Sequence, residues 1–160
     1  MSVVIRKLLG IGKLPDDLRE QLEAEGLIHL VDYVAVTRRF SGAIPGMRST
    51  HSVASYVGSV AFSSHRVLAT LSALPKMAGR TVDVRWDQPQ GGAATVAITE
   101  SGLSVDVDLD ESDPRFHGRL ELDYKTELPA SVLDRLPART LRFDVPPEYV
   151  FRAVGVAYHP

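Results

Sequence analysis

Histidine is the residue type of this chain best suited to acid–base chemistry or metal binding, and the chain has five histidines and no cysteine. They are His29, His51, His65, His117 and His159. No two of them have the HExxH spacing that puts two zinc ligands on one face of a helix. The absence of cysteine excludes disulfides, thiolate metal sites and a cysteine nucleophile. The sequence therefore predicts no metal site and indicates no cofactor.

Serine-based catalysis is not indicated by any motif. Ser52 directly follows His51, but the members of a Ser–His–Asp triad meet in space, and adjacent residues rarely face one another. The nucleophile elbow GxSxG is absent. The segment GIGK at residues 10–13 lacks the four residues between glycines of a phosphate-binding loop, and Leu14 stands where that loop needs Ser or Thr. We expect no catalytic residue from these motifs.

An acidic run, DVDLDESD, has the alternation of a calcium-binding loop at Asp106, Asp108 and Asp110. Such a loop requires glycine after the third acid and glutamate at its twelfth position. Here those positions hold Glu111 and His117. Because alternate residues of a strand share one face, the three aspartates are expected to line a solvated strand face instead.

Overall charge indicates no nucleic-acid partner, because 18 basic and 20 acidic residues give a net charge of only −2. No apolar stretch reaches the length of a membrane-spanning helix, about 18 residues. Arg6 and Lys7 interrupt the apolar start of the chain, whereas a secretory signal carries its charges before a longer apolar segment. We therefore expect a cytoplasmic protein.

The best candidate for ligand binding is the segment SGAIPGMRSTHS at residues 41–52, which is predicted to be a loop. Loops of this length in compact domains are often functional. It carries Arg48 and His51 and follows Arg38 and Arg39. Cations that converge on one rim can hold a phosphate or carboxylate. A solvated hairpin loop in an arginine-rich protein is the alternative interpretation.

Helices are predicted at the N-terminus and before Pro137. Residues 1–11 have a helical spacing of apolar residues, and residues 14–26 begin with Pro15 in a first turn and end at Gly26, typical of a helix end. The second helix presents one narrow apolar stripe, made of Leu14, Leu18 and Leu22. Residues 129–136 predict a further short helix that ends at Pro137.

The rest of the chain alternates apolar and polar residues in short segments separated by turn residues. This pattern predicts an antiparallel meander with one solvated face, because the turns are too short for parallel crossovers. A sheet of this size must curl into a barrel or split into a sandwich to hide its apolar face. Phe62, Trp86, Tyr124 and Phe143 are expected in its core. Nine strands are predicted, at about residues 27–40, 53–62, 66–71, 81–87, 94–98, 103–109, 119–125, 141–145 and 149–156.

The fold class is therefore mainly β with short helices, α+β. Residues 1–26 form a helical appendage that packs on a single β domain of residues 27–160. The extended C-terminal segment leaves room for strand pairing between two copies, so a homodimer is a hypothesis.

The stretch YVGSVAFSSHRVLAT at residues 56–70 resembles bacterial pleckstrin-homology-like and GRAM-type domains, in which a strand beginning near a glycine runs into a Ser/Thr turn and an Arg-hydrophobic strand. The matching positions are Gly58, Val60, Phe62, Ser63, Arg66, Val67 and Leu68. Residues 98–105, ITESGLSV, are similar to a tight hairpin of that family. The resemblance covers about a third of the chain.

This resemblance implies a curved seven-stranded sheet and a lipid, peptide or protein ligand without catalysis. The family's basic first hairpin would fall on Arg38, Arg39 and Arg48. Two features depart from the family: the helical N-terminus is extra, and the segment after Pro137 is predicted to be extended, whereas the family's fold ends in a long amphipathic helix.

Three functions remain open from the sequence. The first is a non-catalytic binding module for an anionic lipid headgroup, peptide or protein, with Arg38, Arg39, Arg48 and His51 as ligand-binding residues. The second is a β-barrel carrier of a small apolar ligand, which needs an internal cavity. The third is an enzyme that uses His51 or His117 as acid or base, which needs a carboxylate near one of these rings.

Overall fold

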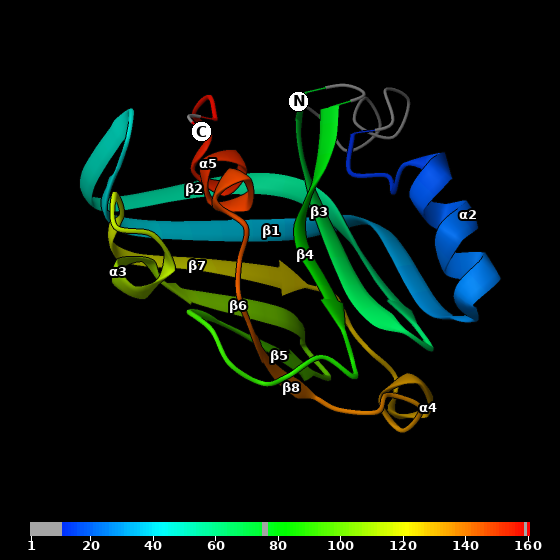
Figure 1. The fold of residues 1–160 in the computed structure, drawn as a ribbon. Helices are drawn as coiled ribbons and strands as arrows, with labels where there is room; N and C mark the ends of the chain where they lie inside the picture. Colours follow the sequence, from blue (N-terminus) through cyan, green and yellow to red (C-terminus); the bar gives the residue numbers. More distant parts are fainter. Residues whose placement is uncertain (1–10, 75–76, 159) are drawn as a thin grey trace.

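A computed structural model of the chain describes residues 11–74, 77–158 and 160 (Figure 1). Among these residues, eight strands form one antiparallel sheet in the order β4-β3-β2-β1-β7-β6-β5-β8. The sheet curls until it is nearly closed into a barrel, so the predicted fold class is confirmed. The strands are β1 (Leu27–Ile44), β2 (Met47–Ser63), β3 (Arg66–Leu74), β4 (Met77–Arg85), β5 (Ala94–Thr99), β6 (Gly102–Asp108), β7 (His117–Lys125) and β8 (Thr140–Phe143).

The helix predicted for residues 14–26 is present as α2 (Asp16–Glu25). It follows Pro15 and ends at Gly26, whose φ of +95° is the left-handed conformation that favours glycine at a helix end. The helix predicted for residues 129–136 is shorter, α4 (Ala130–Leu133). The helix predicted for residues 1–11 lies outside the described residues, except for Ile11 in a turn.

The segment 41–52 is not a loop, so that prediction was wrong. β1 runs on to Ile44, only Pro45 and Gly46 turn the chain, and β2 starts at Met47. A register shift between Phe40 and Gly42 breaks the regular alternation of the hairpin. Its Gly, Pro and Ser content therefore reflects a tight turn and an irregular strand pair instead of an unstructured loop.

The predicted ninth strand, residues 149–156, is also wrong, because this segment forms the helix α5 (Pro147–Val154). Pro147 occupies its first turn, and Gly155 ends it with a φ of +89°. Short apolar runs fit both a buried strand and a buried helix, so periodicity could not decide between them. The segment expected to pair with a second copy is therefore not extended.

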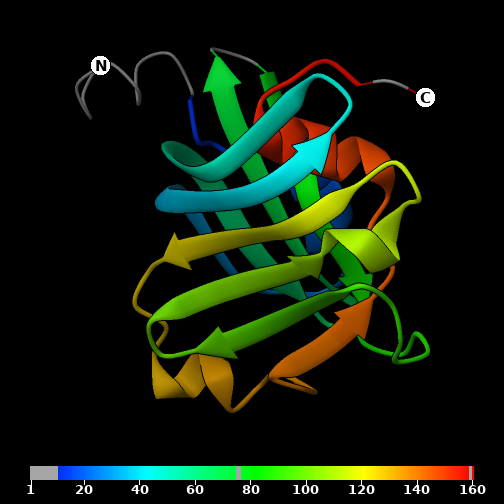
Figure 2. The ribbon, with the colours of Figure 1, turned by 90° about the vertical axis from the view of Figure 1, so that its left-hand side faces the viewer.

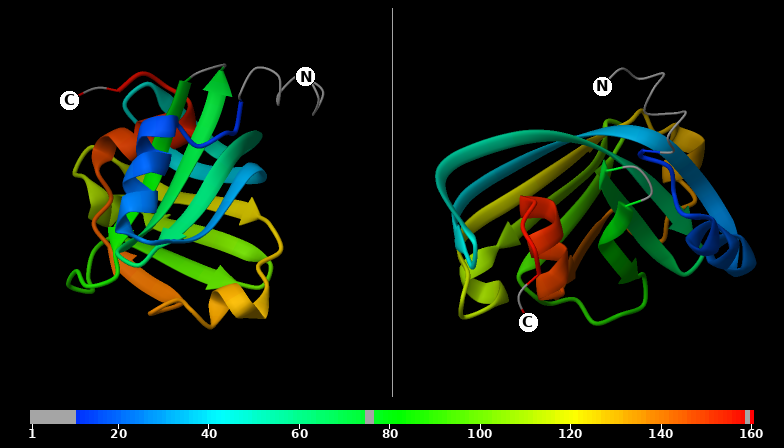
Figure 3. Two further views of the ribbon diagram at one scale, coloured as in Figure 1. Left: turned by 90° about the vertical axis from the view of Figure 1, so that its right-hand side faces the viewer. Right: turned by 90° about the horizontal axis from the view of Figure 1, so that it is seen from above.

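The inner, concave side of the sheet is filled by α5 and by large apolar side chains (Figure 3). α5 packs against β4 and β1. A carrier of a small apolar ligand would need this space to be open. The large side chains that are less than 2% exposed include Phe40, Phe62, Phe116, Tyr124, Phe143 and Phe151.

The expected core aromatics are buried except for Trp86, which lies partly buried beside the core and donates its Nε1–H to the carbonyl oxygen of Ser63. Inside the barrel, the hydroxyl of Tyr124 is 2.6 Å from Oγ1 of Thr81 and donates to the carbonyl oxygen of Thr70 at 3.2 Å. Burial raises the pKa of the Tyr124 hydroxyl, so this group stays neutral and hydrogen-bonded.

The outer side of the sheet carries α2 at one end of the long β1–β2 pair. Leu14 and Leu22 pack there against Ala61 and Leu68, forming a second apolar cluster on the opposite side of the sheet from α5. The hairpin that joins β1 to β2 lies at the opposite end of this strand pair from α2 (Figure 1). Figure 2 shows β1, β7, β6, β5 and β8 following one another in the sheet, with the one-turn helix α3 (Leu109–Ser112) beside the start of β7.

The β8 edge of the sheet and one position of the β4 edge have hydrogen-bond partners outside the sheet. At β8, Arg142 N–H donates to Oε1 of Gln90 at 2.8 Å, so the β4–β5 connection occupies that edge. At β4, the guanidinium of Arg152 in α5 occupies the space beside Gly79 that a Cβ would take there. It donates a hydrogen bond to the carbonyl oxygen of Arg80. Backbone groups occupied in this way are not free to pair with another strand. In the part of the chain described, no helix is long and apolar enough to cross a membrane.

Candidate anion-binding site

Arg38 and Arg39 do not share a rim, because neighbours in a strand point to opposite sides of the sheet. Arg38 lies on the inner side and is 3% exposed. It donates to the carbonyl oxygen of Val154 at 2.7 Å and to Oγ of Ser52 at 2.6 Å, and its guanidinium lies 5.9 Å from the ring centre of Tyr56. Arg38 thus caps the C-terminal, electronegative end of α5 and joins it to the hairpin.

Arg39 lies on the outer side, where its guanidinium is 2.8 Å from Oδ2 of Asp123 on β7. Both side chains are partly exposed, so this is a surface ion pair. The charge of Arg39 is therefore already partnered within the sheet.

Arg48 and His51 are the two sequence candidates that the structure leaves open to solvent. Within the described ranges, the Arg48 side chain has no hydrogen-bond or ion-pair partner. Arg48 is opposite Ala43 of β1, and Ala43 is in turn opposite His117 of β7. Two steps across the sheet separate Arg48 from His117, roughly 10 Å between Cα atoms. The small side chain of Ala43 thus lies between two long basic ones.

A hollow of about 470 Å³ opens at this row of residues on the outer side of the sheet. We call it the hairpin hollow. β1 passes through its middle, with β2 on one side and β7 on the other. Its lining residues are Ser41, Gly42, Ala43, Arg48, Ser49, Thr50 and His117.

Two glycines explain why the strands come together here with little side-chain volume. Gly42 of β1 is opposite Gly118 of β7. A Cβ on Gly42 would overlap the carbonyl oxygen of His117, and a Cβ on Gly118 would overlap that of Ser41. Both glycines have positive φ, +146° and +96°, which other residues rarely adopt. Backbone geometry thus requires glycine at this crossing.

The imidazole of His117 is held from one side by Asp110 of α3. Nδ1 of His117 lies 3.1 Å from Oδ1 of Asp110, and Oδ2 of Asp110 accepts the N–H of Gly118 at 3.2 Å. The hydrogen bond from His117, followed by that from Gly118, lowers the pKa of the Asp110 carboxyl. Asp108 in turn accepts the N–H groups of Asp110 and Glu111 and so caps α3. The carboxylate that orients His117 is thereby fixed by its own helix.

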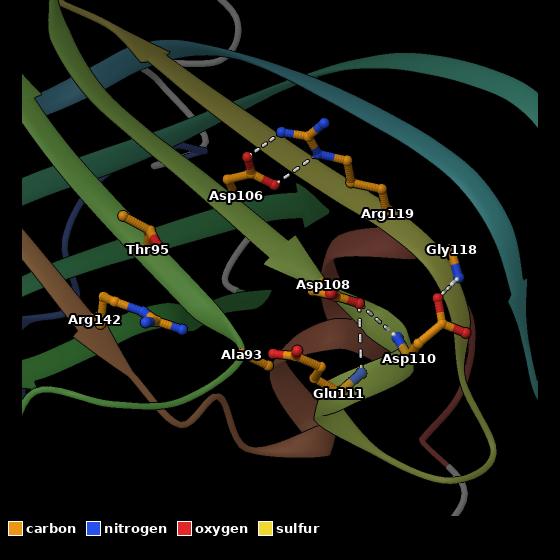
Figure 4. A pocket seen from close by; sticks show the side chains of 9 residues that line it. All are labelled: Ala93, Thr95, Asp106, Asp108, Asp110, Glu111, Gly118, Arg119 and Arg142. Atoms are coloured by element: carbon orange, nitrogen blue, oxygen red, sulfur yellow. Dashed lines mark hydrogen bonds and ion pairs between the residues drawn. The ribbon is translucent and has the colours of Figure 1, made fainter.

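A second hollow, the acidic groove, lies on the other side of this pair and has a volume of about 550 Å³ (Figure 4). Arg119 binds the carboxylate of Asp106 through two nitrogens inside it. Across the described ranges, no group of three His, Asp or Glu side chains is placed to bind a metal ion. The lining residues are Ala93, Thr95, Asp106, Asp108, Asp110, Glu111, Gly118, Arg119 and Arg142.

The side chains of the hairpin hollow bear on both the enzyme hypothesis and the anion-binding hypothesis. The carboxylate that the enzyme hypothesis requires is present beside His117. In the described part of the chain, however, no hydroxyl of the hollow is hydrogen-bonded to that ring, and both His117 and Asp110 are mostly exposed. Arg48, the Thr50 hydroxyl and the imidazole are instead polar groups around a small floor, an arrangement suited to a phosphate or carboxylate.

Of the residues predicted from the sequence, Arg48 lines the hairpin hollow and His51 does not, and the pair of Asp110 and His117 was not predicted. Asp110 was predicted to be a solvated strand residue, and nothing in its spacing to His117 predicts that a single helical turn brings them together. No protein-family model, curated protein or solved structure gives a match to this chain. The function must therefore be inferred from the side chains themselves.

Proposed function

We propose that this protein is a non-catalytic binding module that holds a phosphate or carboxylate group of its ligand in the hairpin hollow. The observation that supports this most is Arg48, an exposed guanidinium that faces His117 across Ala43 and has no partner among the described residues. An arginine without a carboxylate partner has no neighbouring negative charge opposing its own, and its planar set of donors is free for a ligand.

The other arginines near the hairpin support this assignment by contrast. Arg38 is buried and bound to α5, and Arg39 is paired with Asp123. Of the three arginines that the pleckstrin-like resemblance places on the first hairpin, Arg48 is thus the one available for a ligand. Thr50 lines the same hollow, and its hydroxyl is a group that can donate a further hydrogen bond to an anionic oxygen.

The carboxylate of Asp110 limits how much negative charge the site accepts. Asp110 lies directly behind His117, and the acidic groove lies beyond it. A ligand with one compact anionic group fits the hollow, whereas a polyanion extending toward β6 would meet like charges. The same chemistry is offered by a lipid headgroup and by a soluble phosphate or carboxylate.

The test is a binding comparison between the unmodified chain, Arg48→Ala and the control Arg139→Ala. Arg139 is an exposed arginine directly before β8, paired with Asp134. Each protein is titrated with soluble glycerophosphate, and is sedimented with phosphatidylcholine vesicles with and without phosphatidylserine. We expect Arg48→Ala to weaken anion binding about tenfold, the size of one lost charge-assisted hydrogen bond, and Arg139→Ala to have little effect.

Binding to the vesicles alone would identify a lipid headgroup as the source of the anion. Binding to both probes would show that the anion can come from a soluble molecule as well as from a lipid. Equal losses in the two variants, or no binding to either probe by the unmodified chain, would contradict the proposal.

A further inference from the structure

The position of Asp110 determines which nitrogen of His117 carries a proton. An ionised carboxylate only accepts hydrogen bonds, so the nitrogen that faces Asp110, Nδ1, must be the one that bears hydrogen. Asp110 lines the acidic groove, whereas His117 lines the hairpin hollow. The ring is thus bonded to Asp110 through Nδ1, and its other nitrogen, Nε2, is the one that does not face Asp110.

Nε2 changes its hydrogen-bonding role when the ring is protonated. In the neutral ring with hydrogen on Nδ1, Nε2 has a lone pair and can only accept, which disfavours an anion beside it. In the protonated ring, Nε2 becomes a donor and the ring carries a positive charge. The same side chain thus opposes an anion in one state and binds it in the other.

We propose that anion binding in the hairpin hollow is coupled to protonation of His117, and that Asp110 is the positioning residue that makes this coupling possible. The inference rests on the proposed function. Binding becomes tighter as the pH falls, and by reciprocity a bound anion favours the protonated ring.

The charged groups around His117 agree with this coupling. From α3, Asp110 is hydrogen-bonded to the ring; from β2, Arg48 lies opposite Ala43, which lies opposite His117. On β7, Arg119 forms ion pairs with Asp106 and Glu121. β1 contributes Ala43 opposite the ring, without charge. An anion between Arg48 and a protonated His117 is attracted by both positive charges, so binding and protonation support each other.

The experiment uses sulfate, whose charge does not change over the relevant range, titrated into the full chain from about pH 8 to about pH 5.5. We expect affinity to increase at least about fivefold over this range in the unmodified protein. His117→Gln should remove the pH dependence while Arg48 still provides weak binding. Asp110→Asn keeps an acceptor for Nδ1 but loses the charge, so the profile should move to lower pH. His51→Gln, an exposed histidine of the same hairpin, should leave the profile unchanged.

The outcomes separate this inference from the proposed function. Sulfate binding that depends on Arg48 but not on pH, or a profile that follows His51 instead of His117, would overturn the coupling and leave the binding module intact. Absence of binding at every pH would overturn both. A pH profile lost in His117→Gln and shifted in Asp110→Asn supports the inference, because a purely structural role of Asp110 would change affinity without moving the profile.

Discussion

The two ends of the β1–β2 pair differ in how their outer sides are used. At the α2 end, leucines of the helix cover the sheet, and Arg66, whose side chain is 13% exposed, binds Glu25 at 2.8 Å and Asp83 at 3.1 Å. At the hairpin end, nothing in the described structure covers Arg48 or His51. One end of the strand pair thus borders a surface whose charges are matched within the protein, and the other carries an arginine with no partner among the described residues.

This difference separates arginines that stabilise the fold from an arginine that can bind. A buried or half-buried guanidinium with several acceptors is part of the structure, and its removal leaves unsatisfied groups behind. An exposed guanidinium without partners contributes little to stability, so its removal should affect binding alone. Four substitutions or conditions test this distinction.

Removal of Arg38 should have the largest effect on stability. In Arg38→Ala the C-terminal carbonyl of Val154 and the Ser52 hydroxyl lose their donor in a buried place, and a cavity forms under the hairpin. We expect a loss of about 3 kcal/mol in the free energy of unfolding, measured by urea denaturation. Arg38→Lys, which keeps the charge but not the planar donors, should lose less. A loss below about 1 kcal/mol would show that Arg38 does not hold α5.

Removal of Arg66 should have the second largest effect. Arg66→Ala leaves the carboxylates of Glu25 and Asp83 close to the sheet without their common partner. We expect a loss of about 2 kcal/mol and faster proteolysis near α2, because the leucine contacts alone hold a short helix weakly. The control is Arg85→Ala, which removes an exposed pair with Asp87 and should leave the denaturation midpoint nearly unchanged.

The attachment of α2 should also weaken in acid. Burial alone would raise the pKa of the Glu25 carboxyl, but hydrogen bonds from Ser63 and Arg66 and the charge of Arg66 together lower it below its ordinary value. A lowered pKa in the folded state gives stability that is present above the ordinary carboxyl pKa and is lost as the pH falls through the folded value. In Glu25→Gln, the decrease in thermal stability on acidification should therefore be smaller. An identical decrease in both proteins would exclude Glu25 as its source.

Removal of Arg48 should have the smallest effect on stability. Because Arg48 is exposed and without partners in the described residues, Arg48→Ala should change the free energy of unfolding by less than about 0.5 kcal/mol while it weakens anion binding. Unfolding and binding are measured on the same sample. If stability fell as much as in Arg66→Ala, Arg48 would belong to the structural arginines and the distinction between the two ends would fail.

The sequence was informative where local rules determine structure. Pro15 and Gly26 bounded α2, and alternation identified the strands of the meander. The sequence was misleading where a contact between residues far apart in the chain determines the local structure. Gly42 allows β1 to approach Gly118 of β7 closely, and the composition of residues 41–52 could not reveal this contact. Residues 149–156 are helical because they fill the concave side of a sheet that no single segment specifies.

For the site, strand alternation alone separates Arg38 from Arg39, since neighbours in the predicted strand of residues 27–40 must face opposite sides. The partner of Arg38 could not be predicted, because α5 was expected to be a strand. The pair of Asp110 and His117 could not be predicted either, because it depends on the single turn of α3. Arg48 could be named as a candidate from the sequence, because the exposure of a basic residue next to a turn depends on no distant partner.

The most direct test of the hairpin hollow as a binding site is to map amide chemical shifts during titration of the isotopically labelled chain with sulfate at mildly acidic pH. We predict saturable changes concentrated at Ala43, Ser49 and Gly118, and their loss in Arg48→Ala. Changes confined to other parts of the sheet, such as the turn at Ser101, or no saturable change at all, would contradict the account.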